Sequence, residues 1–211
     1  MIGNDVVDLG DLETRPGAQH PRFDARVFAP SERRALEDGE ADNGLRWILW
    51  AAKESAFKAA RREDESTVFA PSQFVVELDP DLRGRVRHRG RDYAVRVSVD
   101  RDRVHAVATD LRAGALRAGC RLLTAHDIRT GVSSRAAREF AASEIARLLA
   151  VSASHLRFRR RGRIPELHPS GSARSELDSA RLARLENSLG RLAVSISHHG
   201  RFVAYACWQC P

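Results

Sequence analysis

The sequence is poor in cysteine, and it has no long apolar run. An odd and sparse count of three cysteines among 211 residues argues against a disulfide-stapled scaffold and favours a reducing compartment. No apolar stretch approaches the roughly 18 residues that a membrane-spanning helix needs. The N-terminus places Asp5, Asp8 and Asp11 before any basic residue, which is unlike a secretory signal. These absences predict a cytoplasmic chain that does not enter the membrane.

Positive charge, in contrast, is in excess. Lys and Arg total 35 against 28 Asp and Glu, for a formal net charge of +7, and arginine supplies nearly all of the surplus. Such a balance favours an anionic partner: nucleic acid, phosphates, acidic lipid or an acidic protein. A merely solvated arginine-rich surface is the alternative. With 43% hydrophobic and 30% charged residues, the composition is that of a globular protein, so charge alone does not select a function.

The hydrophobic periodicity predicts helices and strands in a similar order in both halves of the chain. In the first half we expect helices over 31–37 and 45–62 and strands over 74–78, 93–99 and 104–108. In the second half we expect a helix over 135–150, strands over 156–159, 192–197 and 202–208, and a mobile polar loop over 170–175.

Two hairpins resemble each other, one over 97–108 and one over 194–206. We therefore expect an α+β fold of two similar halves, each a helix packed on a small antiparallel sheet, related by a pseudo-twofold axis. The expected division is a first half over 1–112, a linker over 113–132 and a second half over 133–211.

Two carboxylates in the first half are candidates for a metal site. Asp5 lies in an apolar strand after Gly3, and a buried carboxylate usually needs a cation or hydrogen-bond donors. Glu54 and Lys58 are four residues apart, hence neighbours on one helical face. The alternatives are that Asp5 caps a turn or pairs with an arginine, and that Glu54 and Lys58 form an ordinary exposed pair. Together, however, the two acids could hold Mg²⁺, which commonly takes one or two carboxylates and then phosphate oxygens.

The second half contains candidates for anion binding. Serine and histidine side chains at the end of a strand, as in Ser195-Ile196-Ser197-His198-His199-Gly200, can bind an anion. Residues 157–163 contain five arginines, whose guanidinium groups match phosphates bidentately. A solvated edge strand that resists aggregation would explain most of these arginines equally well.

Taken together, these segments resemble the 4′-phosphopantetheinyl transferase family. The marks of that family are a Gly-x-Asp strand and a Trp-x-x-Lys-Glu-(Ala/Ser)-x-x-Lys helix. Their counterparts here are Gly3-Asn4-Asp5 and the positions Trp50, Lys53, Glu54, Ser55 and Lys58. Family members also carry a Ser-x-Ser-His hairpin, matched by residues 195–198, and the larger ones a Gly-Lys-Pro element, loosely matched by Gly162-Arg163-Ile164-Pro165.

The order of these motifs departs from the family's pattern. In the larger members the Ser-His hairpin precedes the Gly-x-Asp strand, whereas here it comes last, which resembles a circularly permuted two-half enzyme. Val7 stands where larger members often have a third acid. The resemblance leaves open whether water or Asp8 completes the metal shell.

The resemblance implies an enzyme that moves the phosphopantetheine arm of coenzyme A onto a serine of an acidic acyl or peptidyl carrier protein. Asp5 and Glu54 would hold Mg²⁺, and Glu54 and Lys58 would be catalytic. The serine proton would pass to a carboxylate such as Glu54 or to water at the metal. Coenzyme A would be bound by Lys53, Lys58, Arg163, Ser197 and His198, with the last three at the nucleotide end and its 3′-phosphate. The resemblance does not choose among fatty-acid, polyketide and peptide pathways.

Two other functions are compatible with parts of this sequence. A basic α+β module could bind nucleic acid through the arginine cluster without catalysis. No aromatic-rich RNA-binding strand and no helix-turn-helix pattern is evident, however, and two acids beside a polyanion make sense only with metal. A degenerate family member could serve as a scaffold, but the presence of Asp5, Glu54, Lys58 and His198 argues against it. We therefore expect no nucleic-acid partner.

Overall fold

The computed structural model describes residues 1–38, 43–110 and 115–209, which form an α+β fold. The strands are β1 (Ile2–Asp8), β2 (Val75–Leu78), β3 (Arg83–His88), β4 (Arg91–Asp100), β5 (Arg103–Asp110), β6 (Ala115–Leu122), β7 (Leu156–Arg161), β8 (Ile164–Pro169), β9 (Leu192–His199) and β10 (Phe202–Gln209). The α-helices are α1 (Phe23–Val27), α2 (Pro30–Asp38), α3 (Asn43–Glu63), α4 (Ala125–Arg129), α5 (Ser133–Leu149), α6 (Gly171–Glu176) and α7 (Ser179–Gly190). Single 3₁₀ turns lie at Leu12–Thr14, Pro71–Gln73 and Ala153–His155.

The first half is an antiparallel five-stranded sheet in the order β1-β5-β4-β3-β2, with α3 packed across it. The side of α3 that faces the sheet is made of small residues, which let a helix approach a strand closely. Five of its alanines are buried: Ala51, Ala52, Ala56, Ala59 and Ala60. Aromatic side chains fill the rest of this core at Phe28, Trp47, Phe57 and Phe74.

The second half is a three-stranded antiparallel sheet in the order β6-β10-β9, covered by α5. Ile145 of α5 and Tyr205 of β10 share a core with Leu189 of α7. Strands β7 and β8 form a separate hairpin, and α7 packs against β8. The expected arrangement of a helix on an antiparallel sheet therefore occurs twice, while the pseudo-twofold relation between the halves stays a prediction.

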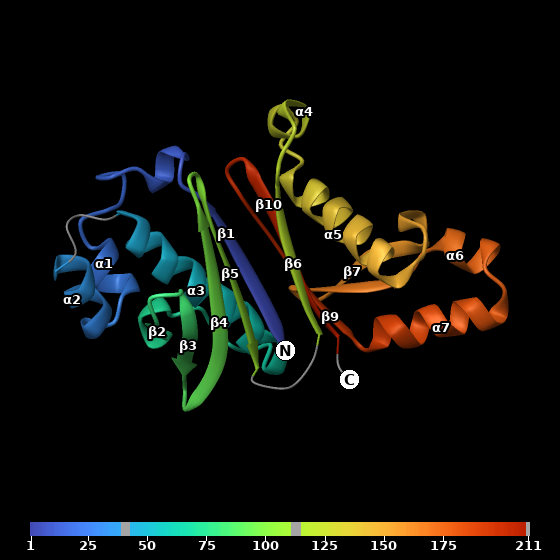
Figure 1. The fold of residues 1–211 in the computed structure, drawn as a ribbon, viewed down its shortest axis with the longest axis horizontal. Coiled ribbons are helices and arrows are strands. Elements are labelled where there is room, and N and C mark those ends of the chain that lie inside the picture. The colour runs from blue at the N-terminus through green and yellow to red at the C-terminus, as the bar shows by residue number, and fades with distance from the viewer. Residues whose placement is uncertain (39–42, 111–114, 210–211) are drawn as a thin grey trace.

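Strand β1 lies where the two halves meet. Figure 1 places α3 and the five-stranded sheet on one side and α5, α6 and α7 on the other, with β1, β9 and β10 between them. All seven residues of β1 are buried. Val7 belongs to the core under α3, whereas Ile2 and Val6 pack against residues of β10. Any residue of β1 is consequently within reach of both halves.

The structure confirms the long helices and both hairpins expected from the sequence, and it corrects two segments. Residues 113–132 were expected to be a linker, but 115–122 form β6, fully paired with β10, and 125–129 form α4. Residues 170–175 were expected to be a mobile loop, but α6 covers most of them. The Ser170 side chain caps that helix and Ala173 is fully buried, so capping and packing order the segment.

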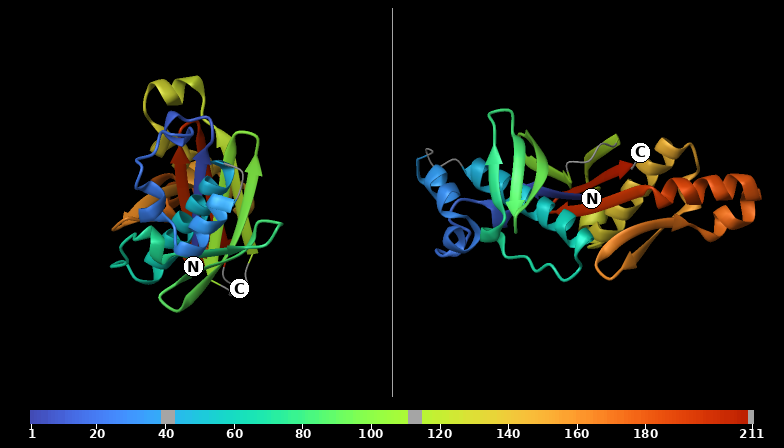
Figure 2. Two further views of the ribbon diagram at one scale, coloured as in Figure 1. Left: turned by 90° about the vertical axis from the view of Figure 1, so that its left-hand side faces the viewer. Right: turned by 90° about the horizontal axis from the view of Figure 1, so that it is seen from below.

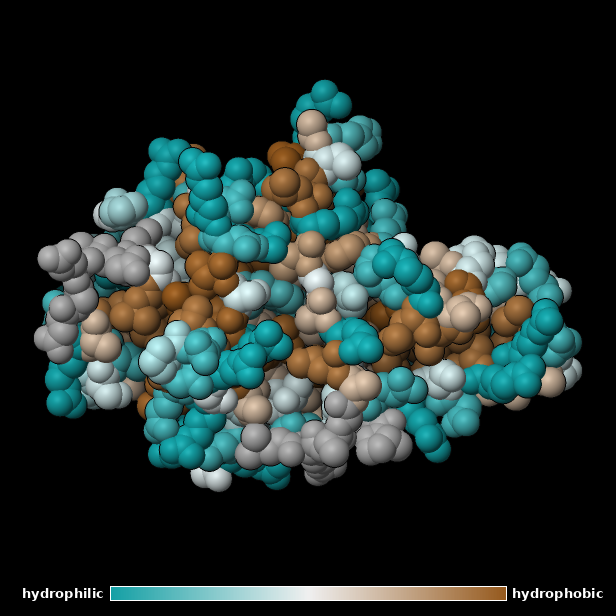
Figure 3. Space-filling model, viewed as in Figure 1, coloured by the Kyte–Doolittle hydropathy of each residue, from teal (hydrophilic) through white to brown (hydrophobic). Residues whose placement is uncertain are grey.

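Across the described ranges, none of the helices has the length and apolar character needed to cross a membrane. On the face viewed in Figure 1, apolar surface gathers toward the middle of the molecule and hydrophilic surface toward its rim (Figure 3). Seen from below, the chain that follows α3 and the β7–β8 hairpin lie on the same side (Figure 2). The ion pair between Glu65 and Arg161 joins these two segments.

Candidate active site

The site begins with a close approach of β1 to α3 at Gly3. A Cβ atom placed on Gly3 would lie 2.0 Å from the carbonyl oxygen of Ser55 and 2.7 Å from the amide nitrogen of Ala59. Only glycine lets the strand touch the helix backbone here. Because side chains alternate along a strand, Asp5 faces the helix as well, at the level of Glu54 and Lys58.

Asp5, Glu54 and Lys58 form one charged cluster. The Lys58 ammonium lies 2.8 Å from Asp5 Oδ1 and 3.8 Å from Glu54 Oε1, and it also donates to the backbone oxygen of Asn4 at 3.0 Å. All three side chains are mostly buried, with 11% of Asp5, 22% of Glu54 and 21% of Lys58 exposed. The sequence-based expectation that these residues lie together is therefore realised in the structure. The cluster has two negative charges and one positive charge.

The electrostatics of the cluster favour an added cation. Burial is the largest influence on the pKa of Glu54 and raises it; the charge of Lys58 lowers it, that of Asp5 raises it, and the net shift is upward. For Lys58, burial lowers the pKa, but the carboxylates of Asp5 and Glu54 outweigh it and the pKa is raised. Two buried carboxylates thus compete for one ammonium.

The donor set fits a hard divalent cation. Asp5 and Glu54 converge on one cationic group, and carboxylate oxygens are the ligands that Mg²⁺ takes from proteins. In the ranges described, no three His, Cys, Asp or Glu side chains gather closely enough to hold a metal by themselves. Water or substrate oxygens would therefore have to supply the other ligands.

Asp8 is occupied elsewhere. Its carboxylate accepts hydrogen bonds from Arg201 Nε at 2.8 Å and Nη2 at 2.6 Å, from the Arg201 backbone at 2.9 Å and from the Gly10 backbone at 2.9 Å. These donors occupy both oxygens, so the Asp8 carboxylate is engaged by Arg201 and Gly10. Whether water completes a metal shell at Asp5 and Glu54 stays a prediction.

Lys53 does not reach the cluster, and its assignment to coenzyme A binding is wrong. Its side chain is fully buried between α2 and α3, where the ammonium pairs with Glu32 at 2.6 Å and donates to the backbone oxygens of Pro71 and Phe74. Five residues along a helix correspond to a rotation of about 500°, so Lys53 and Lys58 point in different directions. Helical periodicity alone could have separated their roles.

The serine-histidine strand meets β1 edge to edge. The Asn4 amide nitrogen donates to Ser195 Oγ at 3.0 Å, and Asn4 Nδ2 donates to Ser197 Oγ at 3.1 Å. Further along, the backbone N–H of Asp8 donates to His199 Nδ1 at 3.1 Å. Side chains of β9 thus satisfy N–H groups of β1 that do not pair with β5. The expectation that Ser197 binds the cofactor is corrected, because its buried hydroxyl accepts from Asn4 and belongs to the junction between the halves.

His198 is exposed and lines a cleft between the two halves, which has a volume of about 180 Å³. Burial and the nearby charge of Lys58 lower the pKa of His198, while Asp5 opposes the shift. His198 and Lys58 line the same cleft. The cleft therefore runs from Lys58, which contacts both carboxylates, to β9 of the second half.

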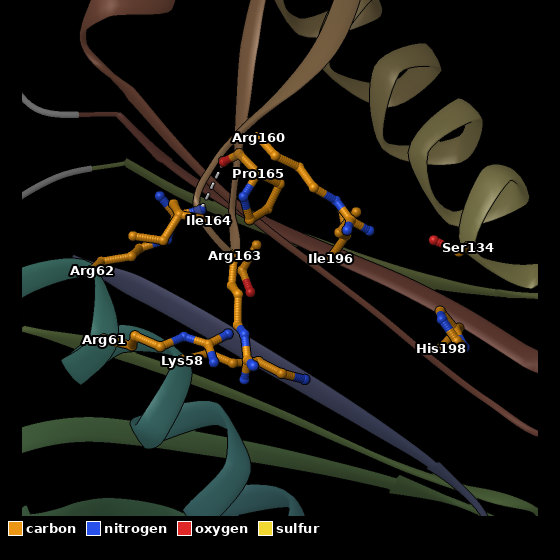
Figure 4. Close-up of a pocket in the computed structure, with 11 residues that line it drawn as sticks. Lys58, Arg61, Arg62, Ser134, Arg160, Arg163, Ile164, Pro165, Ile196 and His198 are labelled. Carbon is orange, nitrogen blue, oxygen red and sulfur yellow. Dashed lines mark hydrogen bonds between the residues drawn. The ribbon is translucent and has the colours of Figure 1, made fainter. Parts of the chain in front are cut away.

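Cationic side chains dominate the wall of this cleft. Lys58, Arg61 and Arg62 come from α3, and Arg160 and Arg163 come from the β7–β8 hairpin (Figure 4). Of these arginines the sequence assigned only Arg163. Arg61 could have been found, because it is seven residues after Glu54 and three after Lys58 and thus lies on the same helical face. Arg62 has a structural partner: its guanidinium donates to the backbone oxygens of Pro165 and Val194.

The site thus combines an acidic cluster with an adjoining arginine-lined cleft. A site of this class suits phosphorylated ligands and a divalent cation. Comparison with known proteins agrees with that class. Residues 1–110 match the family model of the 4′-phosphopantetheinyl transferase superfamily. Because the match covers more than half of the chain, the protein belongs to that superfamily, as the sequence motifs had predicted.

Two individual proteins are similar over parts of the chain. A holo-[acyl-carrier-protein] synthase from Anaeromyxobacter sp. (strain K) is 45% identical over 62 residues, which are 28% of this chain and 48% of the relative. The match thus spans about half the length of that curated relative. The crystal structure of Thermotoga maritima holo-[acyl-carrier-protein] synthase (AcpS) is 18% identical, with a TM-score of 0.33, and the alignment covers 61% of this chain and 72% of that chain.

The family match includes Asp5, Glu54 and Lys58 and ends before β6. Arg163, Ser195 and His198 lie outside it. The match therefore does not test the circular permutation expected from the motif order, which stays a prediction.

Proposed function

We propose that this protein transfers the 4′-phosphopantetheine arm of coenzyme A to a serine of an apo acyl or peptidyl carrier protein, with Mg²⁺. The observation that carries the proposal is the charged cluster itself: two carboxylates meet one ammonium beside an arginine-lined cleft. The superfamily supports this reaction class.

In the proposed reaction, the carrier serine oxygen forms a bond to the phosphorus of the arm, and the bond from that phosphorus to the bridging pyrophosphate oxygen breaks. The products are the holo-carrier protein and adenosine 3′,5′-bisphosphate. Mg²⁺ bound by Asp5 and Glu54 would neutralise charge on the pyrophosphate. The Lys58 ammonium would hold the phosphate being transferred.

Glu54, or water at the metal, would receive the proton of the attacking serine. A carboxylate is a better general base when its pKa is shifted toward the working pH, and the pKa of Glu54 is raised, chiefly by burial. His198 and Arg163 would bind other parts of the cofactor, since both line the cleft. The net charge of +7 would attract an acidic carrier protein and speed encounter.

Mass spectrometry tests the proposal directly. The protein is incubated with coenzyme A, Mg²⁺ and a panel of apo-carrier proteins from fatty-acid, polyketide and peptide pathways. The expected result is a carrier whose mass increases by one phosphopantetheine arm. An unchanged mass for every carrier, with a folded protein that binds a polyanion instead, would support the nucleic-acid-binding alternative. The panel also identifies the pathway.

A further inference from the structure

One buried side chain, that of Asn4, joins three strands from both halves of the protein. Asn4 of β1 is fully buried, and its amide nitrogen Nδ2 lies 3.1 Å from Ser197 Oγ of β9 and 3.2 Å from His105 Nε2 of β5. Because side chains alternate along a strand, Asn4 faces the second half whereas Asp5 faces α3. The residue next to a candidate metal ligand is thus the one that binds the other half.

The backbone of Asn4 contacts both halves as well. Strand β1 is at the edge of its sheet, so every second residue turns its N–H and C=O groups away from β5. At Asn4 the N–H donates to Ser195 Oγ at 3.0 Å, and the C=O accepts from the Lys58 ammonium at 3.0 Å. The position of the Lys58 ammonium therefore depends on how Asn4 is held.

His105 is the second acceptor for the Asn4 amide. An amide nitrogen only donates, so His105 Nε2 accepts and the ring proton lies on Nδ1. Burial, followed by the positive charges of Arg103 and Lys58, lowers the pKa of His105 to about 4, which keeps the ring neutral at physiological pH. Both N–H groups of the amide then have an acceptor, one on β5 and one on β9.

A core selected for stability alone would not need this network. Asn4 Oδ1 is buried and has no hydrogen-bond partner among the described residues, which is unfavourable for folding. Val6, Phe202 and Ala204 fill the same junction with apolar contacts, and an apolar side chain at position 4 would avoid the unpaired acceptor. Hydrogen bonds are directional, however, and a buried polar network fixes one arrangement of the strands that carry it. The network therefore favours exact placement over stability.

We propose that Asn4 is a positioning residue for the proposed transfer: its amide fixes β1 against β9 and thereby sets where Lys58 presents its ammonium in the cleft. Ser197, which the amide binds, is followed directly by His198, and His198 and Lys58 line the same cleft. A shift of β1 along β9 would change the distance between these two groups. Asn4 acts through Lys58, since its own side chain is fully buried.

The double variant Asn4→Leu/Ser197→Ala separates positioning from folding. It should be more stable than Asn4→Leu alone, because fewer buried polar groups are left unpaired. Its turnover should nevertheless stay at least about tenfold below wild type, with the Michaelis constant for coenzyme A changed by less than about threefold, because Lys58 would act on the phosphate being transferred. A network that only held the fold would restore turnover together with stability.

The position of Lys58 can also be measured without any activity, because the chain contains only two lysines, Lys53 and Lys58. In protein made with isotope-labelled lysine, the Lys58 side-chain NMR signal should shift in the double variant, while that of the fully buried Lys53 should not. The matched control is Ser98→Ala, which removes a hydroxyl that donates to the backbone oxygen of His105. This control should change neither the Lys58 signal nor turnover.

An unmoved Lys58 signal, or wild-type turnover in the folded double variant, would overturn the inference. If the double variant does not fold, Ser197→Ala alone removes one acceptor of the amide and should produce the same changes to a smaller degree. The inference rests on the proposed function, yet the two can fail independently. A displaced Lys58 signal with no transfer by the wild type would retain the positioning role and refute the reaction, whereas transfer with an unmoved Lys58 signal would do the reverse.

Discussion

At the residue scale, identical side chains in one motif have different roles. Lys53 and Lys58 belong to the same helix, yet one neutralises a buried glutamate and the other faces the cleft. Glu54 and Arg61 share the face of Lys58. The charged groups of Glu54, Lys58 and Arg61 are available to a ligand, whereas Lys53 and Glu32 stabilise the fold.

We expect Glu54→Gln to abolish transfer while the protein stays folded. The substitution removes a charged metal ligand and the proton acceptor with almost no change in volume, and losing a charged ligand should cost at least about 1.4 kcal/mol, or tenfold. Turnover is measured with excess coenzyme A, and folding by thermal denaturation. Glu63→Gln, on the same helix but paired with Arg91, should keep wild-type turnover. Turnover above about a tenth of wild type in folded Glu54→Gln would contradict its metal role.

Lys53→Met should lower the free energy of unfolding by about 3–5 kcal/mol, because it leaves the Glu32 charge buried and unpaired. The Michaelis constant for coenzyme A should be unchanged, measured at a temperature where the variant is folded. The double variant Lys53→Met/Glu32→Gln should recover part of the stability, since no unpaired charge then remains. A raised Michaelis constant at unchanged stability would return Lys53 to the cofactor site.

At the element scale, segments with small or irregular side chains were the hardest to predict. Strand β6 has no β-branched residue and no clear alternation. A Cβ atom on its Gly119 would lie 3.0 Å from the Tyr205 ring. Pairing with β10, distant in sequence, makes this segment a strand. The helices α3 and α5, in contrast, have long periodic patterns that identify them locally.

The contact between β1 and α3 also belongs to this scale. Gly3→Ala should destabilise the protein by about 1–3 kcal/mol, because the added methyl group collides with the Ser55 carbonyl. Turnover should fall as well, since the displaced strand carries Asp5 away from Glu54 and Lys58. The control is Gly171→Ala at the start of α6, where a Cβ atom meets nothing within 4 Å and a small gain is expected. If Gly3→Ala kept full stability and turnover, the close approach would not be needed.

At the scale of the whole molecule, the junction between the halves determines whether a site exists. The cleft takes its walls from α3, β9 and the β7–β8 hairpin, and β1 is bonded to β9 through Asn4 and Asp8. A relative rotation of the halves would separate Lys58 from His198. Contacts that fix this orientation are therefore as necessary as the site residues.

Asp8 and Arg201 supply one such contact, with a definite dependence on pH. Burial alone would raise the pKa of Asp8, but hydrogen bonds from Arg201 and Gly10 outweigh it and lower the pKa. The folded state thus binds a proton at Asp8 more weakly than the unfolded state does. The contribution of Asp8 to the free energy of unfolding is therefore fully present above the pKa of the unfolded chain, near 3.8. It is lost as the pH falls through the lower pKa of the folded state.

Asp8→Asn should accordingly lower the free energy of unfolding by about 2 kcal/mol at pH 7. The difference from wild type should stay constant down to about pH 5 and shrink below about pH 4. Denaturant titrations across pH measure it. Glu77→Gln, which removes an exposed partner of Arg85, should cost less than about 1 kcal/mol. If the stability difference between wild type and Asp8→Asn grew toward acid pH, the pKa of Asp8 would not be lowered in the folded state, and the prediction would be wrong.

The sequence by itself determined the α+β class, the two long helices, the hairpins and the superfamily, because these depend on periodicity and on motifs with local spacing. It also placed Glu54 and Lys58 on one helical face. Tertiary structure alone decided that Ser197 caps the edge of β1, that Asp8 binds Arg201, and that Arg61 and Arg163 line one cleft. Each of these pairs brings together residues roughly a hundred or more positions apart, and which neighbour a polar group finds across such a distance depends on how the two halves pack.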